Sequence, residues 1–332
     1  MKYLNSSFFI VFIIFFAITV HLTIFYFNFN NPYISIEQDN YIPYEKALEQ
    51  NKVLSLADDA RLFPGYPILI LAVNPIFNYQ KLSGVFISLL STVLAIYVFW
   101  RITNNKIATF AFAFFPPVWF MQGTKIATEP ITVALLLLSI FLFLKKRYFW
   151  SGIITGAAMD IRLISICLAA SIAYILWRNH KIKEALIFLL GVVILFSGLF
   201  VFNFLNFGAG GIFFQFKVYP SFSHATIGFT QIISDIFRAK SWGQYRILLS
   251  GCFYLFINLL AFIVLFKNRK NFPKFSFERV FLYWMAFSLL FIFIYSPTPL
   301  LENFSRYAVV VNAPLILGLI LLDGKNYFKN KK

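Results

Sequence analysis

The sequence is poor in charged residues, in cysteine and in histidine. Only 13% of its 332 residues are charged, whereas soluble domains carry about 25%. The two cysteines, Cys167 and Cys252, both lie in apolar segments, which favours buried thiols over a disulfide. The three histidines, His21, His180 and His224, stand far apart, and no Cys/His spacing is typical of a zinc site. The composition therefore excludes an ordinary soluble domain and indicates neither a zinc site nor a disulfide framework.

What the sequence has in abundance is apolar side chains. Hydrophobic residues make up 60% of the chain, and the mean hydropathy is +0.76. Apolar runs of roughly 17–24 residues recur along the sequence, long enough to span a bilayer. The short alternating segments of a membrane β-barrel are absent. The sequence predicts an all-α polytopic membrane protein with about ten transmembrane helices, forming one domain over residues 1–332.

The expected helices are separated by short loops, except at two places. The spans are predicted near residues 4–28, 81–101, 107–123, 129–144, 184–206, 246–266, 279–295 and 307–322, with two short helices within 149–178 that meet near Asp160 and Arg162. Longer polar loops are expected at 29–80 and 207–245. In the first, Pro43 suits the first turn of an amphipathic helix lying on the membrane surface. Residues 62–77 are read as two proline-interrupted apolar pieces, too short to span.

The basic residues indicate the orientation. With the N-terminus inside, eighteen of the 29 basic residues fall in short inside loops, as the positive-inside rule expects. Of the thirteen acidic residues only Glu184, Glu278 and Asp323 fall inside. We therefore expect cytoplasmic termini and an extracytoplasmic first loop, in a prokaryotic plasma membrane or in the endoplasmic reticulum. The cations are spread over helix ends rather than gathered in a patch, so no nucleic acid is expected as a partner.

The first loop concentrates the scarce carboxylates. Six of the thirteen acidic residues lie between Ile36 and Leu71. They are Glu37, Asp39, Glu45, Glu49, Asp58 and Asp59. Glu37 and Asp39 have two possible interpretations. They are either solvated carboxylates of a loop, or they act as a general base or a metal ligand at the membrane boundary. Glycosyl transfer from a phosphate needs one carboxylate to accept the acceptor's proton, and cations to hold the leaving phosphate.

Several motifs resemble those of the GT-C superfamily of membrane glycosyltransferases. That superfamily includes protein O-mannosyltransferases, lipid A aminoarabinose transferases and PIG-V-like mannosyltransferases. Asp39 and Tyr44, followed by the run from Arg61 to Pro67 (R-L-F-P-G-Y-P), are similar to its first external loop. Further matches are Thr128-Glu129-Pro130, the run from Trp150 through Gly152, Gly156 and Asp160 to Arg162, and Arg306-Tyr307 before the last apolar helix. Where members often read Thr-Arg-Pro, this chain has Ile161-Arg162-Leu163.

The resemblance implies a polyprenyl- or dolichyl-phosphate sugar as donor, with a hexose such as mannose moved to a lipid, glycan or protein acceptor. It implies Asp39 as general base with Glu37 beside it. If the reaction uses a divalent ion, Mg²⁺ or Mn²⁺, these two carboxylates are its candidate ligands. Donor-phosphate binding is assigned to Arg306, Tyr307, Lys125, Arg162 and Arg61, and acceptor-side or structural roles to Tyr66, Glu129 and His224. The absence of a glycine-rich nucleotide-binding unit is consistent with a lipid-linked donor.

Other interpretations stay open at this stage. A membrane acyltransferase would need a catalytic histidine, and His21 lies in an apolar run without a recognisable setting. A lipid or polysaccharide transporter often has two matching halves, but the acidic loop has no counterpart in the second half. Structural roles are also open for several candidate residues. Glu129 could cap a helix, and Asp160 and Arg162 could form an internal ion pair. Lys125 and Arg306 could anchor the protein at the level of the lipid headgroups.

Overall fold

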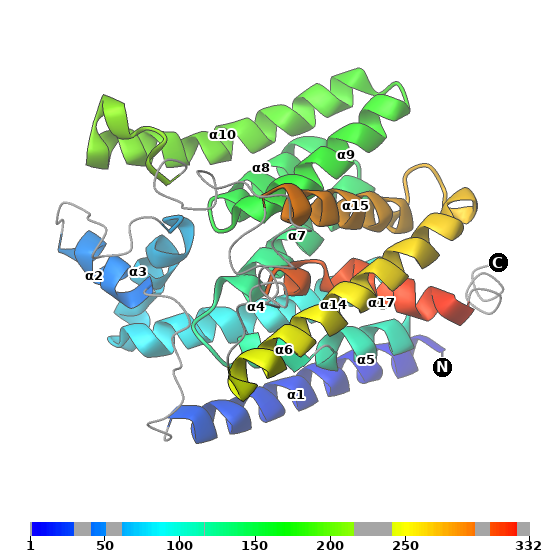
Figure 1. Cartoon of the computed structure of the whole chain (residues 1–332), viewed down its shortest axis with the longest axis horizontal. Helices are drawn as coiled ribbons and strands as arrows, with labels where there is room; N and C mark the ends of the chain where they lie inside the picture. Colours follow the sequence, from blue (N-terminus) through cyan, green and yellow to red (C-terminus); the bar gives the residue numbers. More distant parts are fainter. Residues whose placement is uncertain are drawn as a thin grey trace. The chain divides into compact units, whose positions relative to one another are not determined.

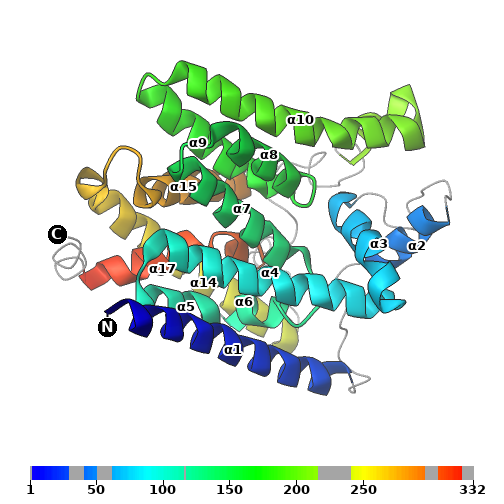
Figure 2. The ribbon, with the colours of Figure 1, turned by 180° about the vertical axis from the view of Figure 1, so that it is seen from behind.

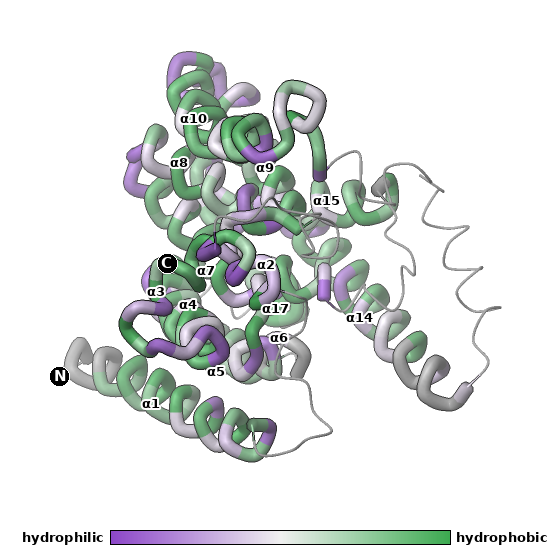
Figure 3. Tube along the Cα trace, turned by 90° about the vertical axis from the view of Figure 1, so that its left-hand side faces the viewer, coloured by the Kyte–Doolittle hydropathy of each residue, from purple (hydrophilic) through white to green (hydrophobic). Residues whose placement is uncertain are grey.

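The computed structural model describes residues 2–29, 41–50, 62–115, 117–215, 241–295 and 306–323. This part of the chain is all-α, with thirteen α-helices (Figure 1). Five helical stretches are long and apolar enough to cross a bilayer, which indicates an integral membrane protein. They are Phe8–Phe29, Gln80–Thr103, Ile182–Phe207, Leu248–Lys267 and Phe277–Ile294. In the hydropathy colouring of Figure 3, α1 (Lys2–Phe29) is apolar along most of its length.

The chain forms two compact units. The first comprises Met1–Ser165 and Ile187–Val218, and the second comprises Ile166–Leu186 and Tyr219–Lys332. In the first unit α4 (Gln80–Thr103) lies between α1 on one side and α7 (Thr128–Leu144) on the other (Figures 1 and 2). The buried face of α4 is rich in small residues, among them Ser83, Gly84, Ser88, Ser91 and Ala95. Small residues let helix backbones approach closely in a membrane protein, so α4 is the central helix of this unit.

Glycine and hydroxyl side chains join α7, α8 (Tyr148–Met159) and α10 (Ile182–Phe207). Between α7 and α8, Ser139 Oγ lies 2.9 Å from Ser151 Oγ and 2.7 Å from Thr155 Oγ1. On the other side of α8, a Cβ at Gly152 would collide with the carbonyl oxygen of Phe188 on α10. The hydroxyls satisfy one another away from water, and the glycine lets the two backbones touch. Helix α8 is therefore held on both sides.

The first-loop helices differ in part from expectation. Helix α2 (Tyr41–Glu49) begins near Pro43 as predicted, but its apolar face is buried within the protein, with Tyr44 packed near Phe202 and Phe207 of α10. The apolar face of α2 therefore packs on other helices of the protein, whereas the sequence predicted that it packs on the membrane. Residues 62–77 were expected as two pieces, whereas Gly65–Phe77 is one helix, α3, with Pro75 inside its last turn.

Prolines explain two other departures. The span expected at 107–123 is two helices, α5 (Lys106–Phe114) and α6 (Pro117–Gln122), because a residue before proline avoids the helical region and proline favours a first turn. The span expected at 307–322 is interrupted at Val311, between helical residues 306–310 and α17 (Asn312–Ile320). Pro314 has no N–H to bond the carbonyl four residues earlier and would crowd it, so the helix restarts at that point.

The second unit contains two helix pairs. Helix α9 (Ile166–Arg178) packs on α15 (Phe277–Tyr295), where Arg178 donates a hydrogen bond of 2.9 Å to the Tyr283 hydroxyl. Helix α14 (Trp242–Lys267) packs on α17, and a Cβ at Gly318 would lie 2.6 Å from that of Ala261. The expected pair of short helices around Asp160 and Arg162 is confirmed as α8 and α9, joined by a 3-10 turn at Leu163–Ser165.

Candidate functional site

The candidate site lies in the first unit, at the N-terminus of α7. Ala127 is extended, with φ −143° and ψ 144°, and Thr128 and Glu129 begin the helix. A carboxylate is favourable in a first turn, because the backbone N–H groups there are unpaired and the helix dipole is positive. Glu129 has no exposed surface, however, and a buried charge is costly unless another group balances it. The position therefore demands a cation.

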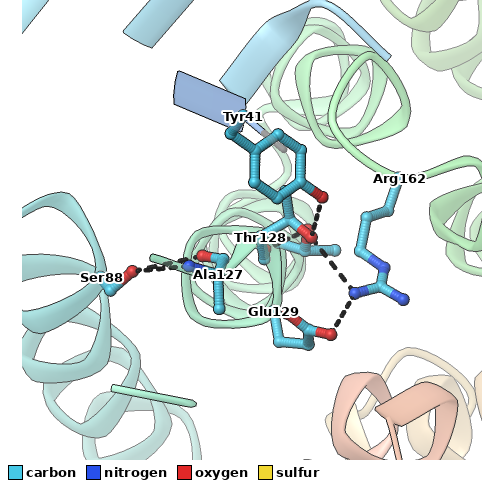
Figure 4. A network of polar contacts seen from close by, with 7 residues as sticks. Tyr41, Ser88, Ala127, Thr128, Glu129 and Arg162 are labelled. Carbon is cyan, nitrogen blue, oxygen red and sulfur yellow. Dashed lines mark hydrogen bonds and ion pairs between the residues drawn. The ribbon is translucent and has the colours of Figure 1, made fainter. Parts of the chain in front are cut away.

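Arg162 supplies that cation. Its Nη1 lies 2.5 Å from Oε1 of Glu129 and donates a hydrogen bond of 3.2 Å to Thr128 Oγ1 (Figure 4). The guanidinium comes from the end of α8, where the Arg162 backbone N–H bonds the carbonyl of Ala158 at 2.9 Å. The Arg162 side chain is 13% exposed. A desolvated arginine–carboxylate pair holds both side chains in one geometry, since breaking it strands a buried charge.

Two tyrosines from the first loop complete the network. The Tyr41 hydroxyl, at the start of α2, lies 3.4 Å from Thr128 Oγ1. The Tyr41 ring meets that of Tyr66 on α3 edge-on, with centroids 5.0 Å apart and planes at 77°. The Tyr66 hydroxyl donates to the Gly84 carbonyl at 3.0 Å and lies 3.1 Å from Ser88 Oγ. Both first-loop helices are therefore anchored to the helices that carry the site.

Ser88 closes the network from α4. Its hydroxyl donates to the Ala127 carbonyl at 3.2 Å and accepts from the Ala127 N–H at 3.4 Å (Figure 4). A serine that satisfies both backbone groups of the residue before a helix positions the start of that helix. The N-terminus of α7, and with it Glu129, is therefore set by α4.

The P-G-Y-P run docks on the same turn that carries Arg162. The Gly65 N–H donates to the Asp160 carbonyl at 3.1 Å. A Cβ at Gly65 would lie 2.7 Å from that oxygen, so only glycine permits this approach. Burial raises the pKa of the Asp160 carboxyl to about 7, and within the described residues its Oδ1 has no hydrogen-bond partner.

Glu45 is a carboxylate that sequence reasoning did not single out. It has no exposed surface, and neither carboxylate oxygen has a hydrogen-bond partner in the described part of the chain. Burial is the main cause that raises its pKa to about 7, with Glu49 raising it further and Lys46 opposing. One sequence signal was present, since Glu45 stands four residues after Tyr41 and shares its helix face.

The structure brings together some of the predicted site residues and not others. Tyr66, Glu129 and Arg162 lie in one network, and half-buried Lys125 stands three residues before Thr128. Arg306 and Tyr307 are half-buried in the second unit, at the start of helical residues 306–310. The remaining predicted residues lie outside the described part of the chain: Glu37, Asp39, Arg61 and His224.

The expected divalent metal depends on those same undescribed residues. Among residues that the structure describes, no group of three or more His, Cys, Asp or Glu side chains could hold a metal ion. The assignment of Mg²⁺ or Mn²⁺ to Glu37 and Asp39 therefore stays a prediction.

No protein-family model matches the chain, and none of the curated proteins matches it.

Proposed function

We propose that this protein is a glycosyltransferase that moves a sugar, a hexose such as mannose, from a polyprenyl-phosphate donor to an extracytoplasmic lipid, glycan or protein acceptor. The observation that supports the proposal is one polar network built from three separate motif segments. Tyr41 and Tyr66 come from the first loop, Thr128 and Glu129 open α7, and Arg162 follows α8. These segments are the ones that resemble the GT-C superfamily.

In the proposed reaction, Asp39 accepts the proton of the acceptor hydroxyl. The hydroxyl oxygen then forms a bond to the anomeric carbon of the sugar. The bond from that carbon to the phosphate oxygen breaks, and its electron pair leaves with the polyprenyl phosphate. Asp39 stands two residues before Tyr41 in the sequence, and Tyr41 is in contact with the network.

The leaving phosphate needs positive charge, since it gains a negative charge as the sugar departs. Arg162 fits this role because Glu129 orients its planar guanidinium, and an oriented guanidinium binds phosphate oxygens in pairs. Lys125, Arg61, Arg306 and Tyr307 are the further donor-binding residues of the proposal. Glu37 and Asp39 are the carboxylates that a Mg²⁺ or Mn²⁺ ion would use.

The proposed topology has about ten spans, both termini in the cytoplasm and the first loop outside. An enzyme acting on the outer face needs a donor that the membrane delivers, because nucleotide sugars stay in the cytoplasm. A lipid-linked sugar satisfies this requirement.

The test is a transfer assay with the purified full chain and a panel of labelled polyprenyl-phosphate sugars. At least one donor should lose its sugar to an added acceptor. Asp39→Asn keeps the side-chain shape and removes its basicity, so turnover should fall by about 10²-fold or more. Asp58→Asn in the same loop is the matched control. Full activity of Asp39→Asn together with loss in Glu37→Gln would reassign the base, and no turnover of any donor by wild type would refute the function.

A further inference from the structure

A pocket lies at the end of α7 opposite to the candidate site. It is formed at the turn between α7 and α8 and is lined by Lys146, Arg147, Tyr148, Phe149, Trp150 and Ile187. All of these residues belong to the first unit. Helix α7 has 17 residues, so the pocket is about 25 Å from Glu129 along the helix axis. It is therefore a separate place on the molecule.

The polar wall of the pocket carries uncompensated positive charge. Lys145, Lys146 and Arg147 are consecutive, and all three are exposed. In the described part of the chain none of them pairs with an acidic side chain. Lys145 instead stands over the ring of Phe141, 5.7 Å from its centroid. The two cations that line the pocket remain available for an anion.

The backbone at Lys146 shows that the lysine occupies an unfavourable position. Its φ is +59°, the left-handed region in which glycine is the usual residue after a helix. The Lys146 N–H bonds the Phe143 carbonyl, and the Arg147 N–H bonds that of Leu142, both at 2.9 Å. This is the Schellman arrangement of a helix end. A lysine at a glycine position keeps a cation at the pocket despite the cost to the backbone.

The other wall of the pocket is aromatic and apolar. The rings of Phe149 and Trp150 meet edge-on at 5.7 Å, and Trp150 is 58% exposed. From Ile187 onward α10 presents the exposed apolar residues Leu190 and Val193. Tryptophan is enriched at the level of lipid headgroups, and an exposed apolar stripe suits acyl chains. The pocket thus has one end for a charged group and a continuing surface for hydrocarbon.

We propose that this pocket binds the phosphate headgroup of an anionic phospholipid, with Lys146 and Arg147 on the phosphate and the acyl chains along α10. Basic pockets between membrane helices are suited to such headgroups, because each basic residue near an anionic lipid adds to the attraction. This site is independent of the proposed transfer reaction.

The experiment measures lipid retention by the detergent-purified full chain, using native mass spectrometry with phosphatidylglycerol and phosphatidylcholine as probes. Wild type should retain phosphatidylglycerol in preference to phosphatidylcholine. The double variant Lys146→Gly/Arg147→Gln should bind phosphatidylglycerol about 30-fold more weakly, given the attraction of two basic residues. Lys146→Gly alone should show part of this loss without a lower melting temperature, since glycine relieves the left-handed backbone.

Two controls separate the site from general effects. His180 is another non-glycine residue with a positive φ, at +58°. His180→Gly relieves the backbone strain there and should leave lipid binding unchanged. Lys267→Gln/Lys270→Gln removes two exposed cations elsewhere and should also have no effect. Equal phosphatidylglycerol affinity in wild type and in the Lys146/Arg147 variants would overturn the proposal. So would stabilisation of wild type by inorganic phosphate as large as that by phosphatidylglycerol, because the pocket would then be a site for free anions.

Discussion

Glu129 and Arg162 are a buried pair in a part of the chain where charge is scarce. Glu129 has no exposed surface, and the Arg162 side chain is 13% exposed. Because the surroundings exclude water, each charge depends on the other, and removing one partner should cost about 3–5 kcal/mol. The pair therefore matters to folding as well as to any reaction at this site.

A double-mutant cycle tests this dependence. Glu129→Gln and Arg162→Met should each lower the thermal stability of the detergent-solubilised protein strongly, and the double variant should lose much less than the sum. The partly exposed pair Lys181–Glu184, with atoms 3.6 Å apart, is the matched control and should contribute less than about 1 kcal/mol. If the loss of stability in the double variant equals the sum of the losses in the two single variants, Glu129 and Arg162 are not a mutually dependent pair.

Several residues of the candidate site could be predicted from the sequence, but the contacts between them could not. Glu129, within the Thr128-Glu129-Pro130 run, and Arg162 were predicted as site residues from motifs alone. The ion pair between Glu129 and Arg162 was not, since it joins residues separated by a whole helix pair. The burial of Glu45 was missed because the expected amphipathic helix placed its apolar face in lipid.

At the scale of the element, α2 responds to pH through Glu45. The ordinary pKa of this carboxyl is 4.5, and burial raises it to about 7. The folded protein therefore holds the proton more tightly than the unfolded chain does. The stability that neutral Glu45 contributes is complete below pH 4.5, falls as the pH rises through the interval to about 7, and is lost above it.

Thermal unfolding between pH 4.5 and 8 measures this effect. In wild type the Glu45 carboxyl should contribute a loss on the order of 3 kcal/mol as the pH rises, at about 1.4 kcal/mol per unit of pKa. Asp160 should contribute a similar loss, because burial also raises its pKa to about 7, so Glu45→Gln and Asp160→Asn should each remove roughly half of the slope. The exposed Glu49 lies on the same helix and is a smaller cause of the raised Glu45 pKa, so Glu49→Gln should reduce the slope much less than Glu45→Gln does. An unchanged slope in Glu45→Gln would refute the assignment.

Element boundaries were predicted well where one apolar run forms one helix. Helices α7, α8, α10, α14 and α15 lie close to their expected positions. The helix boundaries that were predicted incorrectly lie at prolines, because the effect of a proline depends on its position in the helical turn. Pro75 is accommodated near the end of α3, whereas Pro314 coincides with a restart after Val311. Sequence alone does not tell which of these outcomes a proline produces.

At the scale of the whole molecule, the distribution of lysine and arginine predicts how the chain crosses the membrane. A cysteine introduced at Ser55, in a variant with Cys167 and Cys252 replaced by alanine, should react with a membrane-impermeant thiol reagent on intact cells. A cysteine at Asn268, between α14 and the basic 3-10 turn Arg269–Asn271, should react only after permeabilisation. The opposite pattern of labelling would reverse the topology.

The glycine contact between α8 and α10 also has a consequence for how the protein is made. Helix α8 has 12 residues and is about 18 Å long, much shorter than a bilayer core of about 30 Å. Gly156 on α8 approaches the Val192 carbonyl so closely that a Cβ would lie 2.6 Å from it, yet Val192 is translated later. At about 5–20 residues per second, a nascent α8 waits several seconds for its partner. During that interval α8 packs on α7 alone, so we expect the glycine-bearing face of α8 to stay without its partner until α10 has been made.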